Sequence, residues 1–228
     1  MLVKNWMSKK VITVDLDATM QDAMGLIKGN NIQMLPVMKK NKLVGIVSDR
    51  DLKKASASDA NSLEIHELKY LIDEIKVEEI MTKEPITIPF DYTLEETAEV
   101  LLSHKISGAP VVDHEKNVIG VITEKDLFRS LMSLTSLEKR GIQFAFRLED
   151  RPGSIKEVAD IFRKYGGRIA SILSSCDSAE TGYRNVYFRV VNAERSKLHQ
   201  LKTELKRQSK VLYMVDLPEN TREIYATS

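Results

Sequence analysis

The stretch GIVSDRDL, at residues 45–52, governs the architecture because it returns as GVITEKDL at residues 120–127. In each copy an apolar strand passes through a hydroxyl residue into a helix with an acid three positions later, Ser48 and Asp51 in the first copy. The free N–H groups and the positive dipole end of such a helix favour an anion. A single copy of this pattern is more often a plain helix N-cap. Its repetition favours a binding role, with the acid accepting hydrogen bonds from the hydroxyls of a sugar.

The repeat extends well beyond these two stretches. Met81 follows Met7 by 81 − 7 = 74 residues, and Pro110 follows Pro36 at the same offset. Each copy is predicted to fold as strand, helix, strand, turn, strand and helix. A unit of ~50 residues buries too little surface to be robust alone. We therefore expect the two copies to pack face to face and to form a cleft between them.

Local signals give the helix starts and the domain boundaries. Thr19 with Asp22, and Thr93 with Glu96, have the capping-box spacing that predicts the start of the first helix in each copy. A segment between the copies has apolar residues at helical spacing. The expected ranges are 1–56 for the first copy, 57–76 for a linker helix, 77–134 for the second copy, 139–217 for a third unit and 218–228 for a loose polar tail.

The third unit has a different pattern. Large apolar side chains at 142, 144 and 146 alternate with polar or small ones at 143, 145 and 147, as in a half-buried strand. A turn at 150–154 and a helix that stops at Gly166 follow, and the remaining pattern completes the order βαββαβ. Such a unit is predicted to form an antiparallel sheet with both helices on one face. The expected fold class of the whole chain is therefore α/β (α+β).

The composition excludes several classes of function. The 228 residues are 43% hydrophobic and 29% charged, with a net charge of +1, which gives no reason to expect nucleic acid or a membrane as a partner. The single Cys176 and the four scattered histidines do not support a metal site. No apolar run approaches the ~18 residues of a membrane span. We expect a cytoplasmic protein, and the absence of a convergent nucleophile, base or metal cluster argues against an enzyme.

The repeated block resembles a pair of CBS domains. The resemblance rests on the Met-Ser and Met-Thr starts, the Pro-Val strands and the two glycine-to-aspartate stretches. It implies adenine nucleotide binding in the cleft, with Ser48 and Asp51 on one ribose and Thr123 and Asp126 on another. The other implied contacts are Thr13, Thr87, Pro36 and Pro110 for adenine, and Arg50 and Lys125 for phosphate.

The ribose motif is common to AMP, ADP, ATP, S-adenosylmethionine and NAD. The resemblance favours AMP, ADP or ATP over the other two, with no covalent cofactor.

Residues 140–217 resemble an ACT domain, a βαββαβ module that often binds amino acids at a dimer interface. The residues that carry this resemblance are the turn Arg151–Ser154 with the helix after it, and Gly166 followed by Ile169. An amino acid at Arg151–Ser154 is therefore expected as one alternative. Arg168 stands where the family often has asparagine, and the other alternative is that this domain only dimerises.

A CBS pair followed by one ACT domain resembles the bacterial acetoin-utilisation protein family. The resulting hypothesis is a non-catalytic homodimeric sensor that transmits nucleotide binding through its ACT dimer to an unknown protein partner in carbon metabolism, including acetoin metabolism. Two alternatives stay open: a structural dimer with vestigial sites, and an enzyme with an unrecognised active site.

Overall fold

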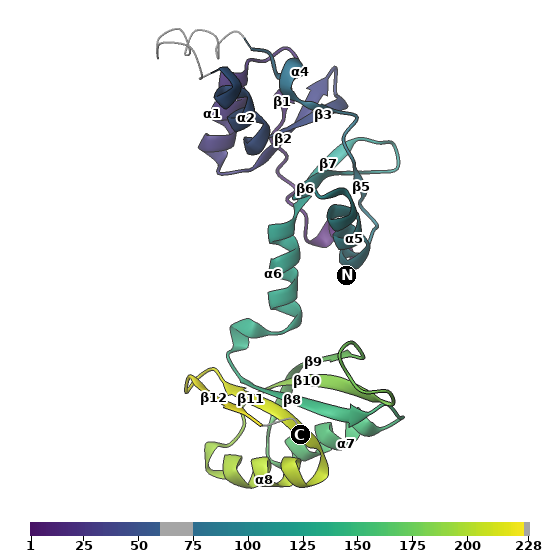
Figure 1. Cartoon of the computed structure of the whole chain (residues 1–228), viewed down its shortest axis with the longest axis vertical. Helices are drawn as coiled ribbons and strands as arrows, with labels where there is room; N and C mark the ends of the chain where they lie inside the picture. Colours follow the sequence, from purple (N-terminus) through teal and green to yellow (C-terminus); the bar gives the residue numbers. More distant parts are fainter. Residues whose placement is uncertain (60–74, 226–228) are drawn as a thin grey trace. The chain divides into compact units, whose positions relative to one another are not determined.

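The computed structural model describes residues 1–59 and 75–225. The chain forms two compact units, Met1–Phe128 and Arg129–Ser228. The first unit contains both copies of the repeat, and the second contains the βαββαβ unit (Figure 1). The predicted α/β fold class is thus confirmed. Most of the predicted linker helix, residues 60–74, lies outside the described residues.

The first copy has the predicted order of elements. Thr19 and Asp22 form a capping box at the start of its first helix, as the spacing predicts. The middle strand pairs in parallel with the strand before it and antiparallel with the strand after it. The elements are β1 (Val14–Asp15), α1 (Met20–Asn30), β2 (Met34–Lys39), β3 (Lys42–Ser48) and α2 (Asp49–Asp59).

The second copy repeats this arrangement. Thr93 and Glu96 form the equivalent capping box. Its helices and strands are α4 (Val77–Ile80), β4 (Thr82–Lys83), β5 (Ile88–Pro89), α5 (Leu94–His104), β6 (Gly108–Val112), β7 (Val118–Thr123) and α6 (Glu124–Leu134). Short 3-10 turns occur at Val3–Asn5, Leu137–Lys139 and Arg195–Lys197.

The two copies exchange their starting segments. Strand β4, at the start of the second copy, pairs antiparallel with β3 of the first copy. Val77, just before it, is fully buried in the core of the first copy. Conversely, Ser8 and Val121 exchange two backbone hydrogen bonds of 2.9 and 3.0 Å, and Val3 is fully buried in the core of the second copy. Each copy therefore completes the other.

Two glycines make this exchange sterically feasible. A Cβ atom on Gly45 in β3 would overlap the side chain of Met81, which begins the second copy. A Cβ atom on Gly120 in β7 would overlap the side chain of Met7 in the same way. The Met and Gly residues of the repeat therefore form two matched contacts, each between one copy and the other.

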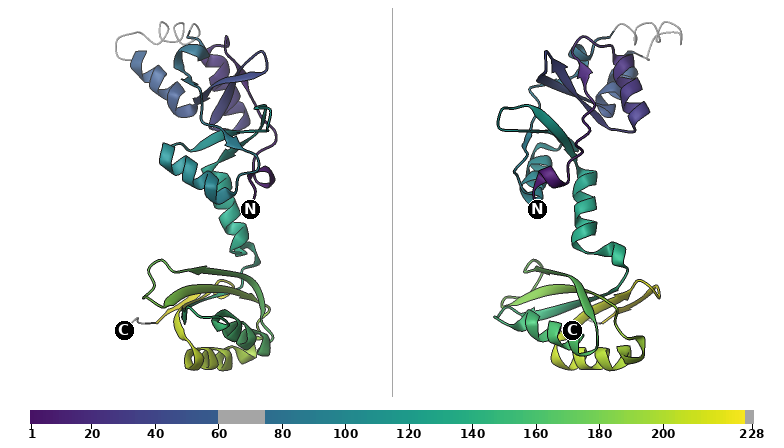
Figure 2. Two further views of the ribbon diagram at one scale, coloured as in Figure 1. Left: turned by 90° about the vertical axis from the view of Figure 1, so that its right-hand side faces the viewer. Right: turned by 180° about the vertical axis from the view of Figure 1, so that it is seen from behind.

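The second unit has the predicted βαββαβ order. Its sheet has the strand order β12-β11-β8-β10-β9, and helices α7 and α8 cover one face (Figure 2). Phe144, Phe146, Phe162 and Phe188 form the centre of its core, and all four are almost fully buried. The elements are β8 (Ile142–Glu149), α7 (Ser154–Lys164), β9 (Arg168–Ser175), β10 (Tyr183–Val191), α8 (Leu198–Gln208), β11 (Lys210–Asp216) and β12 (Thr221–Ile224).

The end of the chain differs from the predicted loose tail. Strand β12 pairs antiparallel with β11 along four residues. Its side chains also contact α8: Lys202 donates to Glu223 at 2.5 Å, and the Lys206 ammonium lies 4.0 Å from the centre of the Tyr225 ring. The polar composition of this segment misled the prediction, because β12 is held by backbone pairing and charge contacts rather than by apolar burial.

Candidate functional site

The first hydroxyl–acid pair lies where β3 leads into α2. Ser48 donates to Asp51 Oδ2 from its hydroxyl at 2.6 Å and from its backbone N–H at 2.9 Å. The Asp51 N–H donates in return to Ser48 Oγ at 3.3 Å. Within the described chain, Asp51 Oδ1 accepts no hydrogen bond. The pair is thus an N-cap that still has one carboxylate oxygen to offer to a ligand hydroxyl.

The second pair repeats the two hydrogen bonds to the acid where β7 leads into α6. Thr123 donates to Asp126 Oδ2 from its hydroxyl at 2.6 Å and from its backbone N–H at 3.0 Å. The structure therefore shows the N-cap bond at Ser48, and both copies share the two hydrogen bonds from the hydroxyl residue to the acid.

A cavity of about 660 Å³ lies at the first pair. The predicted residues Ser48, Arg50 and Asp51 line one part of it. Residues of the second copy line the opposing part, so the cavity lies between the two copies. Its other lining residues are Gln33, Met34, Ile46, Asp49, Thr82, Glu84, Pro85, Ile86, Lys105, Ile106, Ser107, Gly108 and Glu124.

The structure does not bring all the predicted residues to this cavity. Thr13 is exposed just before β1, and Thr87 is half-buried beside the lining residue Ile86. The two prolines are buried in the middle strands of their sheets. Seven of the predicted site residues are not among those that line the cavity: Thr13, Pro36, Thr87, Pro110, Thr123, Lys125 and Asp126.

The second copy's lining residues were missed from the sequence. Two of them, Glu84 and Pro85, reach the first pair because β4 crosses to the first sheet. Another, Glu124, is fixed by its N–H bond to Ser107 O at 3.0 Å. The repeat offset was the one sequence signal for these lining residues, since it aligns them with positions of the first copy. The offset does not show, however, against which copy a segment packs.

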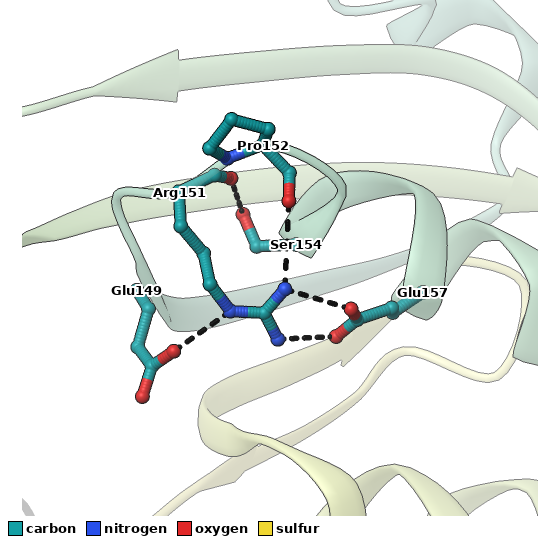
Figure 3. A network of polar contacts seen from close by, with 5 residues as sticks. All are labelled: Glu149, Arg151, Pro152, Ser154 and Glu157. Atoms are coloured by element: carbon teal, nitrogen blue, oxygen red, sulfur yellow. Dashed lines mark hydrogen bonds and ion pairs between the residues drawn. The ribbon is translucent and has the colours of Figure 1, made fainter.

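A second cavity, of about 240 Å³, lies beside the turn Arg151–Ser154 of the second unit. Figure 3 shows the Arg151 guanidinium held by two acids: it donates to Glu157 in a bidentate pair at 2.8 Å and to Glu149 at 2.8 Å. These bonds raise the pKa of Arg151 and lower that of Glu157. The arginine charge is therefore already balanced. The N–H groups of Arg151 and Ser154 also donate to backbone oxygens, so an anionic ligand would depend mainly on the following amides at the start of α7.

The described residues also bear on metal binding, cysteine reactivity and membrane insertion. Among residues 1–59 and 75–225 there is no group of three His, Cys, Asp or Glu side chains placed to hold a metal ion. Cys176 is exposed, with its sulfur 4.0 Å from Asp150 Oδ2. Within the same residues, every helix is too short or too polar to cross a membrane.

Comparison with known proteins supports both domain assignments. Residues 3–58 and 77–133 match the CBS domain family, and residues 143–209 match the ACT domain family. A CBS domain-containing protein of Dictyostelium discoideum is 33% identical over 138 residues, which cover 58% of this chain and 92% of that protein. The uncharacterised protein MJ0188 of Methanocaldococcus jannaschii is 32% identical over 140 residues, 60% of this chain, but the match spans only 46% of that protein.

Among solved structures, the CBS domain pair of protein MJ0100 is similar to this chain. It was crystallised in complex with 5′-methylthioadenosine and S-adenosyl-L-methionine. The TM-score is 0.50 with 32% sequence identity, and the match covers 57% of this chain and 99% of that one.

Proposed function

We propose, from the premise that the chain belongs to the CBS-domain proteins and carries an ACT domain, that it is a non-catalytic regulatory protein that binds an adenine nucleotide or a related adenosine compound. The observation that carries this proposal is the cavity of about 660 Å³ at Ser48 and Asp51, which residues of both copies line. The similar pair of MJ0100 was crystallised with two adenosine compounds, which supports the same ligand class here.

The hydrogen bonds of the first pair suit a ribose. Asp51 Oδ2 is used by Ser48, so Oδ1 is the oxygen that would accept from a ribose hydroxyl. Arg50, which the resemblance to CBS domains assigns to a phosphate, lines the same cavity. Thr123 and Asp126 remain the candidates for a second ribose site, with Lys125 beside them.

Binding between two copies offers a route to regulation. A ligand can shift a conformational equilibrium only through its different affinities for the two states, by a typical coupling of ~1–3 kcal/mol. We propose that the ACT domain transmits this shift as a homodimer to a protein partner. A partner in carbon or acetoin metabolism and a cytoplasmic location remain predictions.

The cavity at Arg151–Ser154 makes an amino acid a second candidate ligand. Because Glu149 and Glu157 already balance the Arg151 charge, a ligand carboxylate would depend on the N-terminal amides of α7. Amino acids therefore belong in the same binding test.

The test is thermal unfolding of the full chain with a panel of adenine nucleotides and amino acids. A ligand at 100 times its dissociation constant stabilises the folded state by ~2.7 kcal/mol. We expect an adenine compound to raise the unfolding temperature of the wild type. In the Ser48→Ala/Asp51→Ala variant, the same compound should no longer raise it. Thr123→Ala/Asp126→Ala tests the candidate second site in the same way. Thr19→Ala/Asp22→Ala is the matched control, because it removes a similar hydroxyl–acid cap outside the cavity.

Each other outcome identifies an alternative. An unchanged response in the Ser48→Ala/Asp51→Ala variant would place the ligand elsewhere. A flat response to every compound at millimolar concentration would favour a structural scaffold. Turnover of the nucleotide by pure protein, lost in Asp51→Ala, would favour an enzyme.

A further inference from the structure

The cavity at Ser48 and Asp51 has an excess of negative charge. Only one of its acids has an ion pair within the described residues: Asp49 pairs with Lys53, which does not line the cavity, at 2.6 Å. The charged lining residues are the acids Asp49, Asp51, Glu84 and Glu124 and the bases Arg50 and Lys105.

One of these acids breaks the repeat. Glu84 follows Lys10 at the offset of 74 residues that relates Met81 to Met7, so the two copies carry opposite charges at one equivalent position. Because the starting segments cross, Glu84 lines the cavity at the first hydroxyl–acid pair.

The backbone at Glu84 is also unusual. Its φ angle is 50°, in the left-handed region that non-glycine residues rarely adopt, and the next residue is Pro85. Such conformations persist only where the surrounding structure fixes them, and they cluster at ligand sites. The backbone thus sets the point from which the exposed Glu84 side chain starts, beside the cavity.

With the Asp49 charge balanced by Lys53, the lining carries three further carboxylates against two cations, and this excess would disfavour a chain of phosphates relative to a ligand without negative charge. We propose that the cavity selects an adenosine compound whose 5′ substituent is uncharged or cationic over a nucleoside triphosphate, and that Glu84 determines this specificity. The proposal rests on the proposed function, since it concerns the same site. It reverses the ligand order that the sequence favoured.

The ligands in the similar pair of MJ0100 agree with this charge pattern. 5′-Methylthioadenosine carries an uncharged thioether at C5′, and S-adenosyl-L-methionine carries a sulfonium cation there. Neither contains a phosphate group.

The test compares adenosine, S-adenosylmethionine, AMP and ATP without divalent cations, by calorimetric titration of the full chain. The variants are Glu84→Gln and Glu84→Lys, the second of which installs the charge of Lys10. Glu115→Lys is the matched control, because it makes the same charge change at an exposed turn outside the cavity. The unfolding temperature of each variant checks its folding.

In the wild type we expect adenosine or S-adenosylmethionine to bind at least ~10-fold more tightly than ATP. Glu84→Lys should increase the affinity for ATP relative to adenosine by about 10-fold, and Glu84→Gln should increase it by less. Higher salt should reduce both effects. Adenosine, which is neutral, should bind the wild type and the three variants with the same affinity.

Two results would overturn the inference while leaving the proposed function intact: ATP binding as tightly as adenosine in the wild type, or equal effects of Glu84→Lys and Glu115→Lys. If none of the four compounds binds, the proposed function itself fails.

Discussion

The two hydroxyl–acid pairs share the hydrogen bonds from the hydroxyl residue to the acid but have different surroundings. Each hydroxyl donates to its aspartate at 2.6 Å, yet only Ser48 and Asp51 line the cavity of about 660 Å³. Four residues of sequence are enough to form the cap, because all its bonds are local. The cavity instead depends on which segments of the other copy arrive opposite the cap. The hydroxyl–acid motif can therefore form its hydrogen bonds whether or not a cavity lies beside it.

The largest expected effect comes from filling the two glycine contacts that hold the copies together. Gly45→Ala and Gly120→Ala should each lower the unfolding free energy of the first unit by ~1–3 kcal/mol, because the new methyl group overlaps a methionine of the other copy. Chemical denaturation measures the change. Since the starting segments are exchanged, each substitution should destabilise both copies in a single transition.

Gly25→Ala is the control for these substitutions. No atom lies within 4 Å of a Cβ atom placed on Gly25 in α1, and alanine is the better helix former by up to ~1 kcal/mol. This variant should be as stable as the wild type or more stable. If Gly45→Ala and Gly120→Ala were as harmless, the methionine contacts would contribute little to the association of the copies.

A smaller effect is expected from the helix caps outside the cavity. Thr19→Ala and Thr93→Ala each remove the hydroxyl that accepts the N–H of a capping acid, at 3.1 and 3.2 Å. Each should cost ~1 kcal/mol. Urea denaturation should give similar losses in both copies and unchanged affinity for the ligand of the cavity. A loss of ligand affinity in either variant would contradict the separation of cap and site.

The smallest effect concerns pH. The hydrogen bond from the Thr19 hydroxyl lowers the pKa of Asp22 below its ordinary value of 3.8, and the bond from the Thr93 backbone lowers that of Glu96 below 4.5. A carboxyl with a lower pKa in the folded state stabilises it above the unfolded pKa and loses this effect as the pH falls through the folded pKa. Both caps should therefore stabilise the protein less only at acidic pH. The cap of α5 should begin to weaken at a higher pH than that of α1, because the ordinary pKa of Glu96 is above that of Asp22.

Carboxyl NMR titration of the full chain checks this prediction. In the Thr93→Ala variant, the pKa of Glu96 should move part of the way back towards its ordinary value while that of Asp22 stays unchanged. Titration of Glu96 at or above its ordinary value in the wild type would show that the capping bond does not form in solution.

The sequence contained much of the fold but only part of the site. Periodicity and capping residues such as Thr19 and Thr93 predicted the elements, because those signals act within one or two helical turns. The lining role of Glu84 was missed, because it depends on β4 pairing with the sheet of the first copy. The strand at Thr221–Ile224 was missed because its pairing with β11 leaves little apolar pattern.

The exchange of starting segments has a consequence for synthesis. While the first copy leaves the ribosome, it lacks both Val77 in its core and the strand β4 that covers the edge of β3. An uncovered edge strand beside an incomplete core is prone to pair with other chains. The first copy can finish folding only when the second has begun to emerge, so the pair, rather than either copy, is the smallest unit that protects itself from aggregation.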